Sequence, residues 1–186
     1  MRKHKAIRFL MVATVLFTQV TFLTMIVNAH YETNAAIIIA ALIILVTIVF
    51  GYRYLDLHHE DYAYEKISVV IWVPIGAVLC YLLNIHGGLG SILAMGIVGT
   101  LAAFIPSLNK KSNYLQQLPA SIYCGAFVGM SSVATTPSIG FVLAAGTLAG
   151  LFFMMSKNLF LGVGGKLGTM AFAGVITATL IYSLTA

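Results

Sequence analysis

Long apolar stretches alternate with short polar connections along the whole chain. A helix that crosses a bilayer needs about 20 mostly apolar residues, and about seven such stretches fit into this sequence. The stretches lack the alternation of polar and apolar positions that a half-exposed β-strand requires. Because backbone groups in hydrocarbon must bond within their own segment, we predict an all-α, polytopic transmembrane helix bundle. The predicted spans cover residues 9–27, 35–50, 67–83, 89–108, 119–135, 139–156 and 168–184.

The composition fits a lipid environment. Of the 186 residues, 60% are hydrophobic and 8% are charged, and the mean hydropathy is +1.00. Soluble domains carry about 25% charged residues, so a soluble globular protein is excluded. We expect one integral membrane domain over residues 1–186, with the lipid bilayer as its main partner. Residues 1–66 hold only Gly51 of the 17 glycines, whereas residues 67–186 are glycine-rich, which predicts closely packed spans.

The basic residues predict an orientation. If seven spans alternate in direction, all ten lysines and arginines lie on one side, and the opposite connections "AHYETN", "NIHGGLG" and "TTPS" contain none. Lys and Arg stay preferentially on the cytoplasmic side, which predicts a cytoplasmic N-terminus and an external C-terminus in a bacterial inner membrane. The net charge of +5 follows from this topology, so we expect no nucleic-acid partner. The first stretch also fits a cleaved secretory signal, but its length favours a retained helix.

Small residues recur at helical spacing in the glycine-rich part. Residues three or four positions apart share one face of a helix, so each such row predicts either close helix packing or a polar path through the membrane. Candidates for a substrate path are Gly125, Gly129, Ser132, Thr136, Gly96 and Thr100. Candidates for helix packing are Gly125, Gly129, Gly146, Gly150, Gly164 and Gly168, which include pairs in GxxxG spacing.

A short internal similarity accompanies these rows. "PIGAV" followed by "GTLAAF" from Gly99 resembles "YCGAF" followed by "GTLAGLF" from Gly146. Both "GTLA" helices would run in the same direction. This predicts a parallel duplication of a helical hairpin, of a kind found in some transporters, although chance similarity between apolar helices is an alternative.

One connection concentrates the ionisable residues. The stretch "LDLHHEDYAYEK" holds four of the five acidic residues and two of the five histidines. If it is helical, Asp56, His59 and Glu60 share a face, and imidazole with carboxylates suits a divalent metal such as zinc. The alternative is a solvated linker whose acids balance neighbouring basic residues, because no HExxH motif or paired cysteine spacing is present. We therefore expect no obligatory cofactor, with a divalent metal as the open alternative.

The interiors of the predicted spans contain no Asp, Glu, Lys, Arg or His. Such groups normally mark proton relays and charged-substrate sites, so a charge-coupled pump is disfavoured. Interrupted helices can instead bind ions or solutes through free backbone carbonyls. The segment "GMSSVATTPS", residues 129–138, is small and rich in hydroxyl groups, and it is the best candidate for such a place.

Three functions remain open at this point. The first is a channel or transporter for an ion or small solute, with selectivity set by carbonyls, hydroxyls and pore width. The second is a non-catalytic accessory or assembly subunit, whose small-residue faces would bind another membrane subunit or a second copy. The third and least favoured is a metal-dependent membrane enzyme that uses His58 and His59. We do not expect an enzyme, because no nucleophile with an adjacent base is recognisable.

Overall fold

The computed structural model describes residues 2–30, 35–53, 63–136, 138–158 and 165–185. It is 84% helical, and no strand occurs in the described part, which confirms the all-α class. The chain divides into two compact units, Met1–Tyr62 and Ala63–Ala186. This boundary lies close to the predicted change in glycine content. That residues 1–186 act as one domain stays a prediction.

The first unit is a pair of helices, α1 (Arg2–His30) and α2 (Ala35–Arg53). Helix α2 is apolar around nearly its whole circumference, and α1 is apolar from Phe9 to Ala29 after a basic first segment, which suits helices surrounded by lipid. Along one side the two helices form an apolar groove with a volume of about 200 Å³. Its lining consists of Val20, Leu23, Thr24, Val27, Ile38, Ala41, Leu42 and Leu45.

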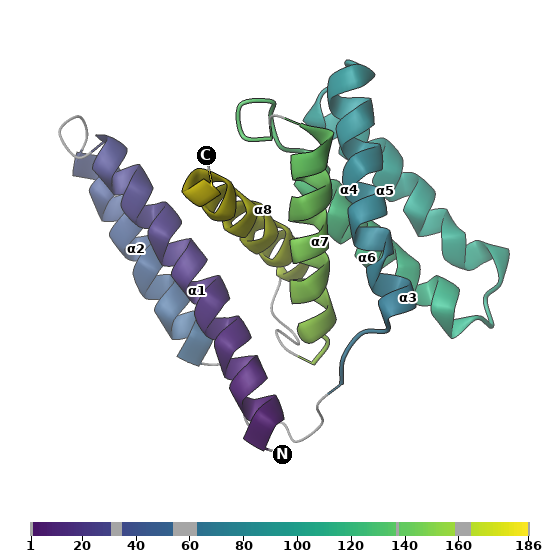
Figure 1. The fold of residues 1–186 in the computed structure, drawn as a ribbon, viewed down its shortest axis with the longest axis horizontal. Helices are drawn as coiled ribbons and strands as arrows, with labels where there is room; N and C mark the ends of the chain where they lie inside the picture. The colour runs from purple at the N-terminus through teal and green to yellow at the C-terminus, as the bar shows by residue number, and fades with distance from the viewer. Residues whose placement is uncertain (1, 31–34, 54–62, 137, 159–164, 186) are drawn as a thin grey trace. The chain divides into compact units, whose positions relative to one another are not determined.

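The second unit begins with a helical rod that changes character along its length. The rod comprises α3 (Ile67–Val70), α4 (Trp72–Tyr81) and the π-helix η1 (Leu82–His86). It is followed by α5 (Ser91–Leu108), α6 (Asn113–Gly129), α7 (Ile139–Met155) and α8 (Lys166–Thr185). Helix α4 packs against α6 and α7, α5 lies against α6, and α8 covers α6 and α7 (Figure 1).

The centre of this unit is a contact between the backbones of α4 and α6. A Cβ atom added to Gly125 of α6 would overlap the carbonyl oxygen of Val73 in α4. A Cβ added to Gly76 of α4 would lie 2.6 Å from the carbonyl oxygen of Ile122 in α6. Both glycines are therefore required for the approach of the two helices, because any side chain would push them apart.

The two glycine contacts between α4 and α6 are exchanged when each residue is replaced by its equivalent in the internal similarity. Gly76 and Gly125 occupy equivalent positions in "PIGAV" and "YCGAF", and the same shift along the chain relates Val73 to Ile122. Gly76 therefore lies against Ile122, and its equivalent Gly125 lies against Val73, which is the equivalent of Ile122. Such an exchange is what a twofold pseudo-symmetry between α4 and α6 requires.

The second helix of each hairpin shows the same exchange. A Cβ added to Gly99 of α5 would lie 2.7 Å from the ring of Tyr123 in α6. A Cβ added to Gly146 of α7 would lie 3.0 Å from Pro74 Cα in α4. Gly99 and Gly146 open the two "GTLA" segments, and Pro74 and Tyr123 are equivalent in the first helices. The hairpins α4–α5 and α6–α7 thus repeat the pattern of glycine contacts that a pseudo-twofold relation between them requires.

The helix lengths support part of the predicted bundle. Four segments are long and apolar enough to cross a membrane, namely 9–29, 67–86, 91–108 and 166–184. The apolar parts of α2 and α7 are shorter. Helix α6 has 17 residues and begins with the polar sequence "NYLQQ". At 1.5 Å per residue it is shorter than a hydrocarbon core of about 30 Å. Seven spans are therefore not confirmed.

The boundaries of α6 correct one prediction. The span was expected over residues 119–135, but the helix begins at Asn113, because the Ser112 side chain accepts a hydrogen bond from Leu115 N and caps it. It continues through Pro119 and ends at Gly129. Its predicted small-residue face therefore stops at Gly129. Ser132 and Thr136 lie in the following loop, so the prediction that they extend that helix face is wrong.

Candidate functional site: a polar cluster where α6 ends

The two symmetry-related helices end differently, and a polar cluster lies at this difference. Helix α6 stops at Gly129, whereas the equivalent rod continues past Cys80 into η1. Asn84 of η1 is buried, with 8% of its surface exposed. Its side-chain nitrogen donates to Gly129 O at 3.2 Å and to Ser131 O at 3.3 Å. Asn84 thereby satisfies carbonyls that the end of α6 leaves without a helical partner.

The loop after α6 is held by further buried polar groups. Tyr81 is 3% exposed, and its hydroxyl donates to Thr136 O at 3.0 Å. Thr136 is fully buried, and its own hydroxyl donates to Ser132 O at 2.9 Å. We call Tyr81, Asn84, Ser131 and Thr136, with the carbonyl of Gly129, the Asn84 cluster.

The chemistry of the Asn84 cluster is that of a neutral, polar site. It combines backbone carbonyls at the negative end of a helix with hydroxyl groups and one amide. Among the described residues, Asn84 Oδ1 accepts no hydrogen bond. The aromatic ring of exposed His86 stands edge-on to Tyr81, with 6.3 Å between the ring centroids. Carbonyl and hydroxyl oxygens suit a small cation or a neutral hydrogen-bonding solute.

The structure does not bring the six predicted path residues together. Gly125 and Gly129 lie against α4, where a Cβ on Gly129 would overlap Ala77 O. Gly96 and Thr100 lie on the exposed face of α5, and within the described part of the chain a Cβ on Gly96 would meet nothing within 4 Å. Ser132 is exposed in the loop, and Thr136 belongs to the Asn84 cluster. A substrate path along these residues stays a prediction.

Of the predicted packing glycines outside α6, two lie at a helix contact and one does not. A Cβ on Gly146 would lie 3.0 Å from Pro74 Cα, and one on Gly150 would lie 3.2 Å from Val70, so both bring α7 close to the α3–α4 rod. A Cβ on Gly168 would meet no atom of the described residues within 4 Å. Gly164 lies outside the described residues. Gly174, which was not predicted, lies against the backbone of α7 at Ala145 and Ala149.

The predicted metal ligands Asp56, His59 and Glu60, and His58 beside them, lie outside the described residues. Within the described ranges, no group of three or more His, Cys, Asp or Glu side chains could hold a metal ion. The metal site therefore stays a prediction about the connection between the two units.

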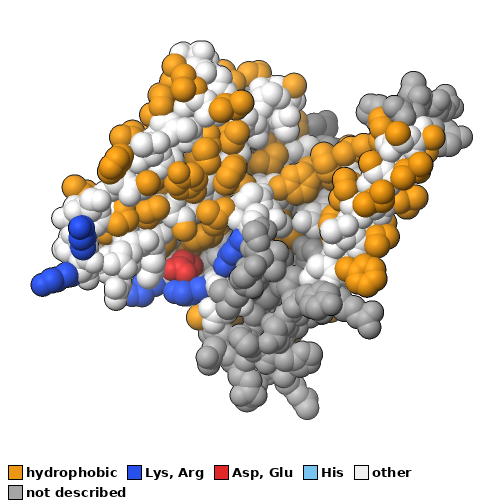
Figure 2. Space-filling view, turned by 180° about the vertical axis from the view of Figure 1, so that it is seen from behind, with side chains coloured by type: hydrophobic (Ala, Val, Ile, Leu, Met, Phe, Trp, Pro, Cys, Tyr) orange, Lys and Arg blue, Asp and Glu red, His pale blue; other side chains and the backbone are white. Residues whose placement is uncertain are grey.

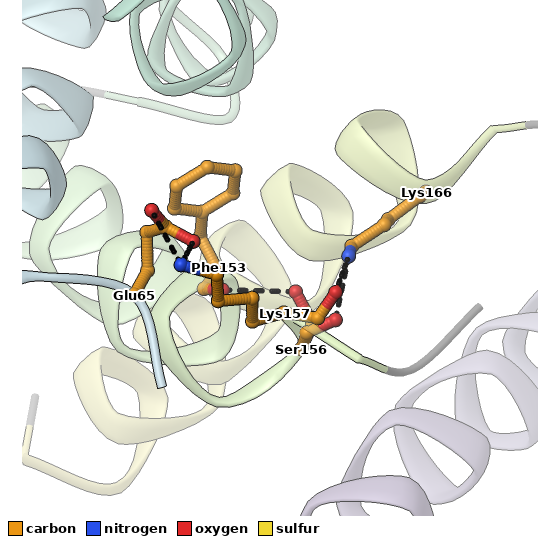
Figure 3. Close-up of polar contacts among 5 residues, drawn as sticks. All are labelled: Glu65, Phe153, Ser156, Lys157 and Lys166. Atoms are coloured by element: carbon orange, nitrogen blue, oxygen red, sulfur yellow. Dashed lines mark hydrogen bonds and ion pairs between the residues drawn. The ribbon is translucent and has the colours of Figure 1, made fainter. Parts of the chain in front are cut away.

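A second polar cluster closes the opposite end of the second unit (Figure 3). Lys166 Nζ at the start of α8 donates to Ser156 O at 2.5 Å and to Lys157 O at 3.1 Å, so it caps the C-terminus of α7. Lys157 Nζ lies 3.2 Å from a carboxylate oxygen of Glu65, and Glu65 N donates to Met154 O at 3.0 Å. These bonds tie the segment before α3 and the start of α8 to one helix end.

Loss of the ion pair is expected to destabilise the second unit moderately. The Glu65 side chain is 9% exposed, whereas Lys157 is 35% exposed, so solvent screens part of the attraction. We expect Glu65→Gln and Lys157→Met each to lower the free energy of unfolding by about 1 kcal/mol, with a coupling energy of similar size. Thermal unfolding of both single variants and the double variant in detergent measures this. Additive effects would show that the pair contributes nothing.

Comparison with protein families, with characterised proteins and with solved structures finds no match to this chain.

The sequence prediction selected the loop that belongs to the Asn84 cluster but did not select Asn84 and Tyr81, and its role as a binding place stays a prediction. Segment 129–138 was selected for its small and hydroxyl-bearing residues, and Thr136 is indeed buried there. Asn84 stands directly after an apolar run in "YLLNIHGG", where it reads as part of an external connection. The only signal in the sequence was that Asn84 follows Tyr81 by about one helical turn. This spacing is a weak signal as long as the contact of Asn84 with the end of α6 is not known.

Proposed function

We propose that this chain is a small polytopic transport protein, a channel or transporter for an ion or small solute. In this proposal it has seven spans, with a cytoplasmic N-terminus and an external C-terminus, in a bacterial inner membrane. Four apolar helices long enough to cross a membrane indicate an integral membrane protein. The shorter helices α2, α6 and α7 would complete the spans with help from their polar flanks.

The observation that carries the proposal is the Asn84 cluster at the end of a duplicated, parallel helix pair. Parallel repeats related by an axis along the membrane normal occur in transporters, where interrupted helices supply carbonyls to the substrate. Here α6 is the interrupted helix, and Asn84, Tyr81 and Thr136 converge on its end. A solute or cation would exchange water for these carbonyl and hydroxyl oxygens.

The route would run beside α6 and not between α4 and α6. Gly76 and Gly125 bring the backbones of α4 and α6 into contact, which leaves no space between the helices for a solute. In the proposal, the two small-residue faces therefore have different tasks. The glycines between α4 and α6 hold these two helices in contact. The exposed face of α5 with Gly96 and Thr100 is available to a second copy or another subunit.

That exposed face also favours the second candidate, an accessory or assembly subunit. Glycine in a helix interior costs about 1 kcal/mol relative to alanine, and Gly96 gains no close contact within the described chain in return. A partner helix packed at this position would account for it. A metal-dependent enzyme has no comparable support, because the loop with His58 and His59 lies outside the described residues.

The proposal is tested by flux into proteoliposomes that contain the purified chain. We expect passage of at least one member of a panel of monovalent cations, protons, divalent metals and small neutral solutes, above the rate of protein-free vesicles. The double variant His58→Ala/His59→Ala should transport equally if that loop is a solvated linker, and lose flux if it is a gate or metal sensor. Absence of flux for the whole panel, together with co-purification of another membrane protein, would replace transport by the accessory function.

A further inference from the structure

A hydrogen-bonded aromatic pair joins the start of the α3–α4 rod to the start of α6. Trp72 Nε1 donates to the Tyr114 hydroxyl at 2.9 Å, and this hydroxyl donates to Ser68 O at 3.2 Å. Tyr114 is 40% exposed. Trp and Tyr side chains concentrate at the level of lipid headgroups, where a ring contacts acyl chains while its polar atom stays hydrated.

Three lysines flank this pair in the chain. Lys66 directly precedes α3, and Lys110 and Lys111 form the turn directly before α6. The bond from Tyr114 to Ser68 places these two segments at the same end of the unit. All three lysines are exposed, and none of them pairs with an acidic side chain of the described residues. Figure 2 shows lysine side chains along this edge of the second unit, next to the apolar surface of its helices.

The turn that carries two of the lysines is fixed by its own hydrogen bonds. Asn109 Oδ1 accepts from Lys111 N at 3.1 Å, and Gln116 Nε2 donates to Lys110 O at 2.8 Å. Ser112 caps α6, whose first turn contains no acidic residue. The positive end of α6 therefore adds to the lysine charges. These bonds connect the backbone of both lysines to the side chains of Asn109 and Gln116.

We propose that Lys66, Lys110 and Lys111, around Trp72 and Tyr114, bind the phosphate of an anionic phospholipid. The positive charges complement a phosphate, and the exposed side chains of Ile67 and Ile71 lie beside the site for contact with an acyl chain. A soluble phosphate would gain only the electrostatic part of this binding. The inference needs a membrane-embedded chain but does not depend on transport, so failure of either proposal leaves the other standing.

The experiment uses Trp72, the single tryptophan of the chain, as the reporter. The full chain is reconstituted with phosphatidylglycerol or phosphatidylcholine whose acyl chains are brominated near the headgroup, and quenching of tryptophan fluorescence is measured. We expect brominated phosphatidylglycerol to quench more strongly than its share of the lipid predicts. Each lysine near an anionic lipid contributes roughly fivefold in affinity. The variant Lys66→Gln/Lys110→Gln/Lys111→Gln should therefore lose the preference.

The matched control is Lys66→Arg/Lys110→Arg/Lys111→Arg, which retains the charge and should retain a preference for phosphatidylglycerol. Equal quenching by both lipids in the wild-type chain would overturn the proposal, and so would an unchanged preference in the glutamine variant with native circular dichroism. Loss of the preference on addition of millimolar glycerol phosphate would assign the site to soluble phosphate instead of lipid.

Discussion

Gly125→Val is expected to prevent correct folding of the second unit. The valine Cβ would overlap Val73 O, and this atom belongs to the α4 backbone, which cannot rotate away as a side chain can. Overpacking in a well-packed core costs about 1 to 3 kcal/mol, and a clash with backbone lies at or above the upper end. We expect loss of a sharp thermal transition and low yield in detergent, measured by size-exclusion chromatography and circular dichroism.

The matched control is Gly96→Val on α5, where an added Cβ meets no described residue within 4 Å. Valine has a higher helix propensity than glycine, so yield and melting temperature should equal or slightly exceed those of the wild-type chain. A well-folded Gly125→Val protein would contradict the close approach of α4 and α6. A destabilised Gly96→Val protein would instead show that a second copy or another subunit covers α5.

The internal similarity identifies which glycines form the contact between α4 and α6. Gly76 and Gly125 are symmetry-related and close the helix pair, so substitution at either should have a comparable effect. Gly129 is equivalent to Cys80 and lies against Ala77 and Cys80 of α4. A bulky substitution at Gly129 therefore tests packing and not permeation. Experiments on transport need residues whose change leaves the α4–α6 contact intact.

The fold could be predicted from the sequence where long apolar runs decide it. The run over residues 67–83 required a helix, and the structure has a helical rod over 67–86. The end of α6 could not be predicted in this way, because residues 130–135 remain compatible with an apolar helix. At this end Asn84, which is distant in the sequence, bonds the carbonyls of Gly129 and Ser131. Tertiary hydrogen bonds of this kind leave no mark on local periodicity.

Small residues pose the same problem for the candidate site. Gly96 and Gly125 stand in similar apolar sequences, yet one faces away from the unit and the other touches α4. Spacing alone defines a helix face but not what that face contacts. The internal similarity was the more informative signal, because equivalent glycines in the two hairpins make equivalent contacts.

Asn84→Leu is expected to abolish flux while the second unit remains folded. Leucine resembles asparagine in size, but it donates no hydrogen bond to Gly129 O or Ser131 O. Each buried carbonyl left without a donor costs about 1 to 3 kcal/mol, which the loop can relieve by moving toward water. The loop would then no longer hold Thr136 beside Tyr81. Flux in proteoliposomes and hydrogen exchange of residues 130–136 measure the two consequences separately.

The control for this substitution is Thr147→Val on α7. The Thr147 hydroxyl is exposed and, among the residues that the structure describes, bonds only to Leu143 O of its own helix, so its loss should change neither flux nor exchange. Tyr81→Phe removes one bond of the same cluster and should give an intermediate result. If residues 130–136 of Asn84→Leu exchange faster but flux stays at the wild-type rate, the Asn84 cluster only stabilises the loop. If flux is lost while hydrogen exchange elsewhere in the second unit stays native, the cluster lies on the transport route, because only the groups around Asn84 would then differ from the wild-type chain.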